Sequence, residues 1–495
     1  MLSNKINQTT IKEIAKQAID WSFGHSLIFE KKKTDQENEV VPYPIVTHIP
    51  ISLLPNRFPK KLYGTANSLA KDYNELVHQL SRNYNYIQDT LKNVQDSFTQ
   101  SLLEIHRAVN KEGLRQSVEL GIFRSDYMLH QATDNEEDWK LYQVELNTIS
   151  SSFGCISTKV SEMHKFLIEF YGLQSQYPLA SLPENHADVE FCKAFAKAFE
   201  LYGKQDAVVM IIVQPDERNI WDQKMIGYTL WQNHKIRMIR RTLQDINERA
   251  TLHPETGALL IAGYTPNDYP SQKEWDARLL VERSLSIKCP SIANHLVGAK
   301  KIQQAIAKTG ILEQLYQPSD SSAIGRMRDS FTGLYSLSKE DIDRSVVERA
   351  IQHPELFVMK PQREGGGNNI YGENVRTSLQ TMSPDDLSSY ILMDRIVPKT
   401  FSSYIIRERE LHEIEALYEL GIFGLYVGNG DRIEYNENGG ILLRTKTSTS
   451  DEGGVAAGFA FEYSDSTIII SIFLNLKSES QHLVQMVSSN SLILV

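Results

Sequence analysis

The sequence has few cysteines and no long apolar run. Its three cysteines, Cys155, Cys192 and Cys289, lie far apart in 495 residues, so they predict neither a disulfide framework nor a thiolate zinc site. No stretch reaches the roughly 20 apolar residues of a membrane span. The N-terminal residues are polar where a secretory signal is apolar. These absences favour a reducing compartment, and we expect a cytoplasmic protein without a membrane partner.

Basic residues are too few for a general nucleic-acid surface. Lysine plus arginine number 52 against 62 acidic residues, for a net charge of −10, so a bound anion needs a local cationic site. Hydrophobic residues make up 41 % of the chain and charged residues 23 %, proportions that exclude wholesale disorder. A chain of 495 residues is long enough for about two to four domains.

Several short catalytic motifs are missing as well. The sequence contains no GK[ST] phosphate loop, no G-x-G-x-x-G fingerprint, no G-x-S-x-G nucleophile elbow and no H-E-x-x-H metal pair. We therefore expect the serines not to act as nucleophiles, and the histidines to be structural or surface residues.

The spacing of apolar residues predicts an α/β protein. Helical spacing alternates with apolar runs in the middle of the chain, which favours parallel strands, and the density of strands in the last third favours a mixed or antiparallel sheet. The predicted helices cover residues 9–22, 69–80, 188–202, 219–233 and 271–286, and the predicted strands cover residues 207–213, 235–242, 257–264, 356–360, 390–396, 413–427 and 439–446.

The most informative segment is FVMKPQREGGGNNIYGENV, residues 357–375. A strand ends at Lys360, and the glycines that follow let backbone N–H groups approach a phosphate, as a mobile lid does. Lys360 and Arg363 supply positive charge, and Glu364 and the two asparagines after the glycines offer oxygen ligands for Mg²⁺. The alternative is a flexible glycine turn between two strands.

Two further clusters combine charge with small residues. In QVELNTISSSFG, alternation places Glu145 and Asn147 on one face of a strand before a serine turn, and Arg124 is a candidate clamp for a carboxylate. In LLRTKTSTSDEGGVAAG, Arg444 and Lys446 share a strand face before an acidic, glycine-containing loop that suits a substrate cover. Taken alone, the first cluster is more often structural, and the second has a solvated turn as its alternative.

Seven longer segments follow one another between about residue 10 and Phe459: QVELNTISSSFG, ERNIWDQ, ARLLVERSLSIKCPSIA, FVMKPQREGGGNNIYGEN, YILMDRI, ELGIFGLYV and LLRTKTSTSDEGGVAAG. Together they closely resemble the eukaryotic glutathione synthetases. The resemblance implies an α/β ATP-grasp ligase with an inserted parallel-sheet substrate domain and a glycine-rich lid. It also implies a homodimer that joins γ-glutamylcysteine to glycine with ATP and two Mg²⁺ ions per active site, through an acyl phosphate.

The resemblance assigns roles to individual residues. Lys300, Lys360, Arg124 and Arg444 are the expected catalytic cations, with both lysines on the ATP phosphates. The expected metal ligands are Glu145, Asn147 and Glu364. The remaining ATP contacts are expected from Gly365, Gly366, Gly367, Asn368, Asn369, Tyr371, Met393, Asp394, Arg395, Ile396, Glu419, Lys446 and Glu452. The expected substrate contacts are Arg124, Ser150, Ser151, Ser152, Asn219, Gln223, Tyr264, Arg444, Val455 and Ala456.

We expect four parts along the chain. Residues 1–205 form a helical N-terminal part with the first portion of the ATP-grasp core, and residues 206–300 form an α/β substrate-binding domain. Residues 301–459 complete the core and the lid. Residues 460–495 continue where the family normally stops, and we expect an atypical, poorly packed tail.

A second departure lies at the substrate strand, where Ala262 stands in place of the family's arginine before Gly263 and Tyr264. This change predicts weaker dipeptide binding. Two alternatives to the ligase stay open at this point. One is a catalytically impaired nucleotide-binding subunit of the same fold, and the other is a ligase with another acceptor amine.

Overall fold

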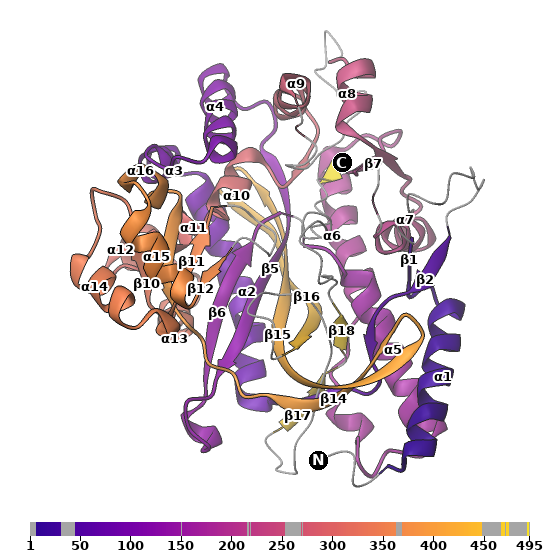
Figure 1. Ribbon diagram of the computed structural model, residues 1–495. Coiled ribbons are helices and arrows are strands. Elements are labelled where there is room, and N and C mark those ends of the chain that lie inside the picture. Colours follow the sequence, from indigo (N-terminus) through magenta and orange to yellow (C-terminus); the bar gives the residue numbers. More distant parts are fainter. Residues whose placement is uncertain are drawn as a thin grey trace, which may run out of the picture.

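The computed structural model describes residues 6–30, 45–149, 151–214, 217, 219–252, 269, 271–362, 369–447, 467–470, 472–474 and 493–494. A large sheet runs through the middle of the molecule with helices on both faces, and a smaller sheet with its own helices lies beside strand β6 (Figure 1). This arrangement is the α/β architecture that the sequence predicts.

Eleven of the described strands form the large sheet, in the order β14–β3–β18–β16–β15–β5–β9–β19–β7–β8, with β6 also paired to β5. The central strands pair antiparallel, whereas β7 and β8 pair parallel, so the sheet is mixed as predicted. The strands are β3 (Ile51–Ser52), β5 (Val118–His130), β6 (Lys140–Asn147), β7 (Val209–Ile212), β8 (Met238–Arg241), β9 (Lys288–Cys289), β14 (Phe401–Arg407), β15 (Glu410–Asn429), β16 (Arg432–Thr447), β18 (Ile472–Leu474) and β19 (Ile493–Leu494).

Two helical layers bury the faces of this sheet. Strand β15 shows the reason, since Phe423, Leu425 and Val427 pack in one core and Leu420 and Tyr426 pack in the other. The first layer contains α1 (Gln8–Gly24), α5 (Gly154–Phe170), α6 (Ala187–Tyr202) and α7 (Ile220–His234). The second contains α2 (Lys60–Ser81), α3 (Tyr84–Leu91), α4 (Ser97–Glu112), α10 (Ile292–Val297), α11 (Lys300–Ala307), α12 (Ile311–Leu315) and α13 (Ala323–Ser330).

The smaller sheet has the order β10–β13–β11–β12. On one side, Phe357, Met359 and Leu392 pack in the core that this sheet shares with its helices. On the other side, Val358 and Met393 belong to an apolar cluster that includes side chains of the large sheet. The elements are β10 (Leu334–Ser336), α14 (Arg344–Gln352), β11 (Phe357–Pro361), β12 (Ile370–Tyr371), α15 (Glu373–Thr381), α16 (Pro384–Leu387) and β13 (Tyr390–Asp394).

The remaining described α-helices and β-strands are α8 (Leu243–Arg249), α9 (Gln272–Glu282), β1 (Ile28–Glu30), β2 (Val46–His48), β4 (Asn56–Pro59) and β17 (Thr467–Ile470). All five predicted helices are thus present, and the predicted strands are present except residues 257–264, which lie outside the described residues.

The described pieces of the C-terminal segment pair with strands elsewhere in the chain, and the expectation of a poorly packed tail stays a prediction. Strand β17 pairs with β4, β18 lies between β16 and β3, and β19 pairs with both β7 and β9. The described pieces of this segment therefore satisfy backbone hydrogen bonds within two sheets, because short β-branched runs can extend any strand edge that is open to them.

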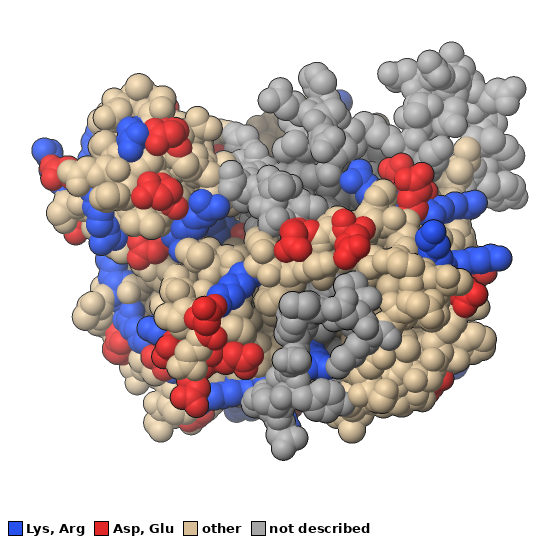
Figure 2. All heavy atoms as spheres, turned by 60° about the horizontal axis from the view of Figure 1, so that its bottom comes forward, with Lys and Arg blue, Asp and Glu red and all other residues tan. Residues whose placement is uncertain are grey.

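All three cysteines are free and buried. None of the helices in the described part of the chain is both long enough and apolar enough to cross a bilayer. On the face shown in Figure 2, described basic and acidic side chains are interspersed.

Candidate active site

Charged side chains gather on one face of four neighbouring strands. The register places Asp126 of β5 opposite Glu145 of β6 and opposite Gly421 of β15. On the far side of β15, Glu419 lies opposite Arg444 of β16. Because residues opposite one another in an antiparallel pair share a face, these side chains converge across the sheet.

Asp126 lies at the centre of this convergence. It has no exposed surface, and its carboxylate accepts from Arg124 Nε at 2.7 Å and from Arg124 Nη2 at 3.0 Å. The same carboxylate accepts from Arg444 Nη2 at 2.5 Å and from Asn147 Nδ2 at 2.8 Å. Arg444 also donates to Glu419. Two arginines and one amide are thereby fixed around a single buried carboxylate.

A pair of lysines lies beside Glu145. The Nζ of Lys300 is 2.9 Å from a carboxylate oxygen of Glu145, and Lys360 Nζ donates to the Val144 carbonyl at 2.8 Å. Each lysine is only 5 % exposed. Val144 falls at a register shift between β5 and β6, and such a bulge leaves a residue out of the strand pairing. Its carbonyl is therefore available to the lysine.

The Lys300 position depends on one glutamine. Gln303 of α11 accepts from the backbone N–H of Leu146 at 3.0 Å and donates to the Leu146 carbonyl at 3.2 Å. This two-way contact fastens the first turn of α11 to the end of β6. Because Lys300 begins α11 and Glu145 precedes Leu146, the contact also holds the ion pair together.

The electrostatic environment keeps these groups charged. Burial acts to raise the pKa of Glu145, but the charges of Lys300, Lys360 and Arg444 outweigh it and hold that pKa well below its ordinary value. Burial acts to lower the pKa of Arg444, and the carboxylates of Asp126 and Glu419 raise it above the usual range. The site thus combines ionised groups of both signs.

The serine turn lies next to this cluster. Arg124 Nη1 is 3.5 Å from the Ser152 carbonyl, and Ser151 Oγ donates to the Asn147 carbonyl at 3.4 Å. After the turn, Phe153 takes a left-handed conformation with φ of 74°, and α5 begins.

Asp222 of α7 caps the start of α5. Its carboxylate accepts from the backbone N–H groups of Phe153 at 2.7 Å and Ile156 at 3.0 Å. Asn219 donates to Asp222 at 3.3 Å, and Gln223 donates to Glu217 at 3.0 Å. The structure therefore places two predicted substrate residues, Asn219 and Gln223, in the hydrogen-bond network that supports the serine turn.

An apolar cluster joins the two sheets. Met128 of β5, Val358 of β11, Met393 of β13 and Ile396 are buried in it, and Tyr371 packs against it. Asn369 donates to the Tyr371 hydroxyl at 3.2 Å.

The neighbouring residues of β13 are engaged through polar contacts. The carboxylate of Asp394 accepts from the Tyr335 hydroxyl at 3.0 Å and from Arg349 at 3.4 Å. The backbone N–H of Arg395 donates to the Leu356 carbonyl at 2.8 Å. Of the four predicted adenine-side residues, Met393 and Ile396 are therefore buried in the apolar cluster, whereas Asp394 and Arg395 make polar contacts.

Known proteins resemble this chain over most of its length. The profile described as "Eukaryotic glutathione synthase, ATP binding domain" matches residues 8–467. The glutathione synthetase of Dictyostelium discoideum is 52 % identical over 91 % of this chain and 97 % of its own length. The chain belongs to the eukaryotic glutathione synthase family.

Other relatives are consistent with this membership. The human glutathione synthetase is 38 % identical over 91 % of this chain and 95 % of its own length, and the chloroplastic enzyme of Arabidopsis thaliana is 41 % identical over 92 % of this chain and 85 % of its own. A glutathione synthetase-like effector from Globodera pallida has the same fold, with a TM-score of 0.72 at 20 % identity over 95 % of this chain and 98 % of that one.

Part of the predicted site lies outside the described residues. This group contains Ser150, Tyr264, Glu364, Gly365, Gly366, Gly367, Asn368, Glu452, Val455 and Ala456, together with the side chain of Lys446. Within the described ranges, no group of three or more His, Cys, Asp or Glu side chains could hold a metal ion. The predicted metal set contributes Glu145 and Asn147 to the described part.

Sequence reasoning from the family resemblance missed Asp126, Gln303 and Asp222. A signal for Asp126 was present, because the alternation in Arg-Ser-Asp places Arg124 and Asp126 on the same face of a strand. The sequence held no comparable signal for Gln303 or Asp222, since each acts on a backbone group far away along the chain.

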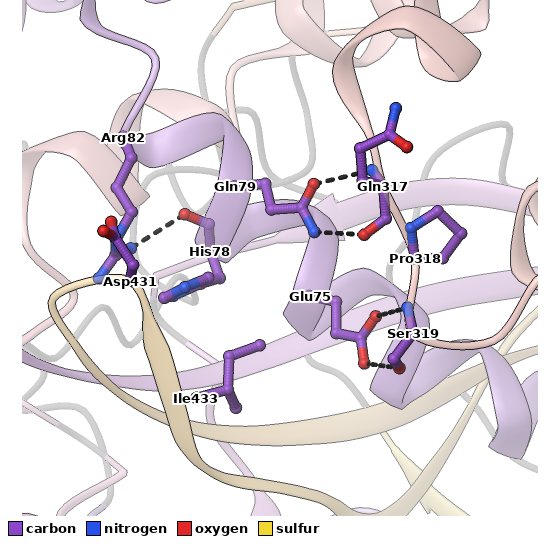
Figure 3. A pocket seen from close by; sticks show the side chains of 9 residues that line it. All are labelled: Glu75, His78, Gln79, Arg82, Gln317, Pro318, Ser319, Asp431 and Ile433. Atoms are coloured by element: carbon purple, nitrogen blue, oxygen red, sulfur yellow. Dashed lines mark hydrogen bonds between the residues drawn. The ribbon is translucent and has the colours of Figure 1, made fainter.

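The structure also contains a cavity of about 540 Å³ away from these residues. It lies between the C-terminal half of α2, residues 317–319 and the turn that joins β15 to β16 (Figure 3). Gln79 exchanges two hydrogen bonds with the backbone of Gln317, and Glu75 accepts from both the N–H and the hydroxyl of Ser319. Since none of its lining residues belongs to the converging charges, the cavity is not the candidate active site.

Proposed function

We propose that this chain joins γ-glutamylcysteine to glycine at the expense of ATP and releases glutathione, ADP and phosphate. Glutathione synthesis by ATP-dependent ligation is the activity of the family to which the chain belongs. The observation that carries the proposal is the meeting of Lys300, Lys360 and Glu145 beside the arginines held by Asp126. Four cations beside a few carboxylates suit a site that must take up a triphosphate and a dicarboxylate.

The reaction needs no protein nucleophile. A carboxylate oxygen of the cysteinyl residue attacks the γ-phosphorus of ATP, the bond to the β-phosphate oxygen breaks, and ADP leaves. The amine of glycine then attacks the acyl carbon, the bond to the phosphate oxygen breaks, and the amine loses a proton. Lys300 and Lys360 stabilise the charge on the phosphoryl oxygens, because preorganised cations in a dry site act where charge develops.

The arginines are proposed to bind the dipeptide. Arg124 directs Nη1 towards the serine turn, and the buried Nε of Arg444 has no hydrogen-bond partner among the described residues. Both groups suit a substrate carboxylate. Ser150, Ser151, Ser152, Asn219, Gln223, Tyr264, Val455 and Ala456 complete the proposed substrate site.

The donor atoms near the lysines fit Mg²⁺. Glu145 is ionised, and the amide of Asn147 turns its nitrogen towards two acceptors, so its oxygen is the atom left to coordinate. We propose that Glu145, Asn147 and Glu364 hold two Mg²⁺ ions, which would neutralise phosphate oxygens when bound.

The glycine-rich segment between β11 and β12 is proposed to be the lid over ATP, and closing such a segment excludes water that would hydrolyse the acyl phosphate. The apolar cluster around Met393 and Ile396 is the proposed adenine pocket. The further ATP contacts in this proposal come from Asp394, Arg395, Glu419, Lys446 and Glu452, together with Gly365, Gly366, Gly367, Asn368, Asn369 and Tyr371 of the lid.

The test is product formation by the purified full chain. We expect glutathione and ADP to appear in equal amounts, and only when ATP, Mg²⁺, γ-glutamylcysteine and glycine are all present. ADP binding without turnover would favour the impaired nucleotide-binding subunit instead. A competition assay between glycine and β-alanine tests the second alternative. Preferential use of β-alanine would favour a ligase with another acceptor amine.

The departure at Ala262 leads to a separate experiment. We propose that the missing arginine weakens dipeptide binding, since loss of a desolvated charged contact costs about 2–5 kcal/mol. Ala262→Arg should therefore lower the KM for γ-glutamylcysteine. An unchanged KM would refute this explanation.

Assembly, location and domain limits are also proposals. We propose a homodimer, to be checked by analytical ultracentrifugation, and a cytoplasmic location, to be checked by cell fractionation. The three free, buried cysteines support a reducing compartment. We retain the four proposed parts of the chain, 1–205, 206–300, 301–459 and 460–495, and limited proteolysis would test their boundaries.

A further inference from the structure

Asp126 is the most heavily engaged carboxylate of the site, and it contacts three residues to which roles are proposed. It is fully buried, and it accepts two hydrogen bonds from Arg124, one from Arg444 and one from Asn147. These partners come from three different strands, namely β5 itself, β16 and β6. Asp126 is therefore the one point of contact that links both substrate arginines to the proposed metal ligand among the described hydrogen bonds.

The contacts determine which edges of the arginines remain for a ligand. Asp126 occupies Nε and Nη2 of Arg124, which leaves Nη1 directed at the serine turn. On Arg444, Asp126 and Glu419 both occupy Nη2, and the buried Nε has no hydrogen-bond partner in the described part of the chain. A guanidinium donates in a fixed planar fork, so fixing one edge also fixes the direction of the others.

The same carboxylate decides how the Asn147 amide is turned. The Nδ2 group of Asn147 lies 2.8 Å from Asp126 Oδ2 and 3.3 Å from the Arg124 carbonyl oxygen. Both of those atoms only accept, so the amide cannot be reversed without losing two hydrogen bonds. Oδ1 of Asn147 is thereby left as the atom for a cation.

We propose that Asp126 is a positioning residue for the ligation: it orients Arg124 and Arg444 towards the dipeptide and turns Oδ1 of Asn147 towards the metal. It does not touch the reacting atoms. This inference rests on the proposed function, because it concerns the same site.

The close packing around the Asp126 carboxylate also supports this positioning role. Gly421 of β15 lies opposite Asp126, and a Cβ at that position would be 2.8 Å from Asp126 Oδ1 and 2.9 Å from Arg124 Cδ. Glycine thus leaves room for the Arg124–Asp126 pair. A methyl group at this position would displace the pair without removing any charge.

The first test is Asp126→Asn in the full-length protein. An amide is uncharged and accepts through only one atom, so either Arg124 loses its Nε bond or Arg444 and Asn147 lose their acceptor, and both arginines lose the negative charge. We expect the KM for γ-glutamylcysteine to rise by about 30-fold or more, the fold-change that follows from losing one partner of a buried charge pair. The KM for ATP should rise by a smaller factor, since Lys300 and Lys360 do not contact Asp126 and the effect reaches ATP only through Asn147, one of three proposed metal ligands.

A matched control separates positioning from stability. Asp72 is also buried, and it also holds an arginine through two bonds, from Arg326 Nε at 2.9 Å and Nη2 at 2.8 Å, but it lies in α2 outside the site. Asp72→Asn should reduce stability to a similar degree and leave both KM values unchanged. Calorimetric titration with γ-glutamylcysteine gives a second readout that does not depend on turnover, and the Asp126 variant should bind the dipeptide more weakly by the same factor.

Gly421→Ala is a second test that does not depend on whether Asp126→Asn folds. It should also raise the KM for γ-glutamylcysteine more than the KM for ATP. A folded Asp126→Asn or Gly421→Ala protein with unchanged dipeptide affinity would overturn the proposal, as would equal losses for the dipeptide and ATP. If the unmodified chain makes no glutathione but calorimetry still shows this selective loss of dipeptide binding, the proposed function fails and the positioning role stands.

Discussion

The ion pair between Lys300 and Glu145 allows a quantitative test of the site's electrostatics. Lys300→Met removes the ammonium group and keeps a chain of similar length. The two charged atoms are 2.9 Å apart, and the side chains are 6 % and 25 % exposed. Breaking a buried pair leaves an uncompensated charge and costs about 3–5 kcal/mol. Because Glu145 is partly exposed and Lys360 remains near it, we expect a loss of about 2 kcal/mol in the free energy of unfolding.

The pH dependence of this loss has a defined sign. Burial acts to raise the pKa of Glu145, but Lys300 and Lys360 hold it well below its ordinary value of 4.5. A depressed carboxyl pKa contributes stability that is complete above the unfolded pKa and is lost as the pH falls below it. The difference between the wild-type protein and Lys300→Met should therefore be constant from about pH 8 to pH 5.5 and should shrink below about pH 4.5.

The assay is urea unfolding across this pH range, together with the KM for ATP at neutral pH. Lys301→Met is the control, because Lys301 is equally buried and pairs with Asp341 at 3.3 Å, and it has no proposed ATP contact. We expect both variants to lose stability, and only Lys300→Met to raise the KM for ATP. A stability loss of Lys300→Met that stays the same down to pH 4, or an unchanged KM for ATP, would refute the reasoning.

Two further predictions concern burial. Asp222→Ala removes the acceptor for two backbone N–H groups at the start of α5. This loss should lower the free energy of unfolding by about 1–2 kcal/mol and raise the KM for γ-glutamylcysteine. The control Asp188→Ala, on α6, should leave that KM unchanged. Burial lowers the pKa of His164 to about 4, so only the unfolded chain binds its proton between pH 6.5 and 4, and stability should fall as the pH is lowered. His164→Gln should make this fall shallower by about 1.4 kcal/mol per pH unit. The control is His353→Gln at an exposed position, which should leave the slope of stability against pH unchanged. Equal slopes for the wild-type protein and His164→Gln in circular-dichroism melts would contradict the prediction.

The local elements of the fold could be predicted because local signals specify them. The helix at residues 188–202 and the strand at residues 207–213 are α6 and β7 in the structure, since their apolar spacing has the period of each element. The parallel pairing of β7 with β8 also followed from the alternation of helices and strands.

The pairing of the C-terminal segment could not be predicted in the same way. Strand β19 lies between β7 and β9, more than 200 residues away along the chain. No local pattern specifies such a partner, because strand pairing depends on which edges the rest of the fold leaves open.

The sequence by itself determined the chemical groups of the site. Its motifs pointed to Lys360, the two arginines and the strand that ends in Glu145 and Asn147 as the proposed site, because each lies on a short element with a recognisable pattern, and the family resemblance added Lys300. Only the tertiary structure decided how these groups meet. The convergence depends on the register of four strands, the bulge at Val144 and the buried carboxylate of Asp126, and these are properties of distant segments packed together. Charges attract over several ångströms, but only a packed sheet holds them at hydrogen-bond distance.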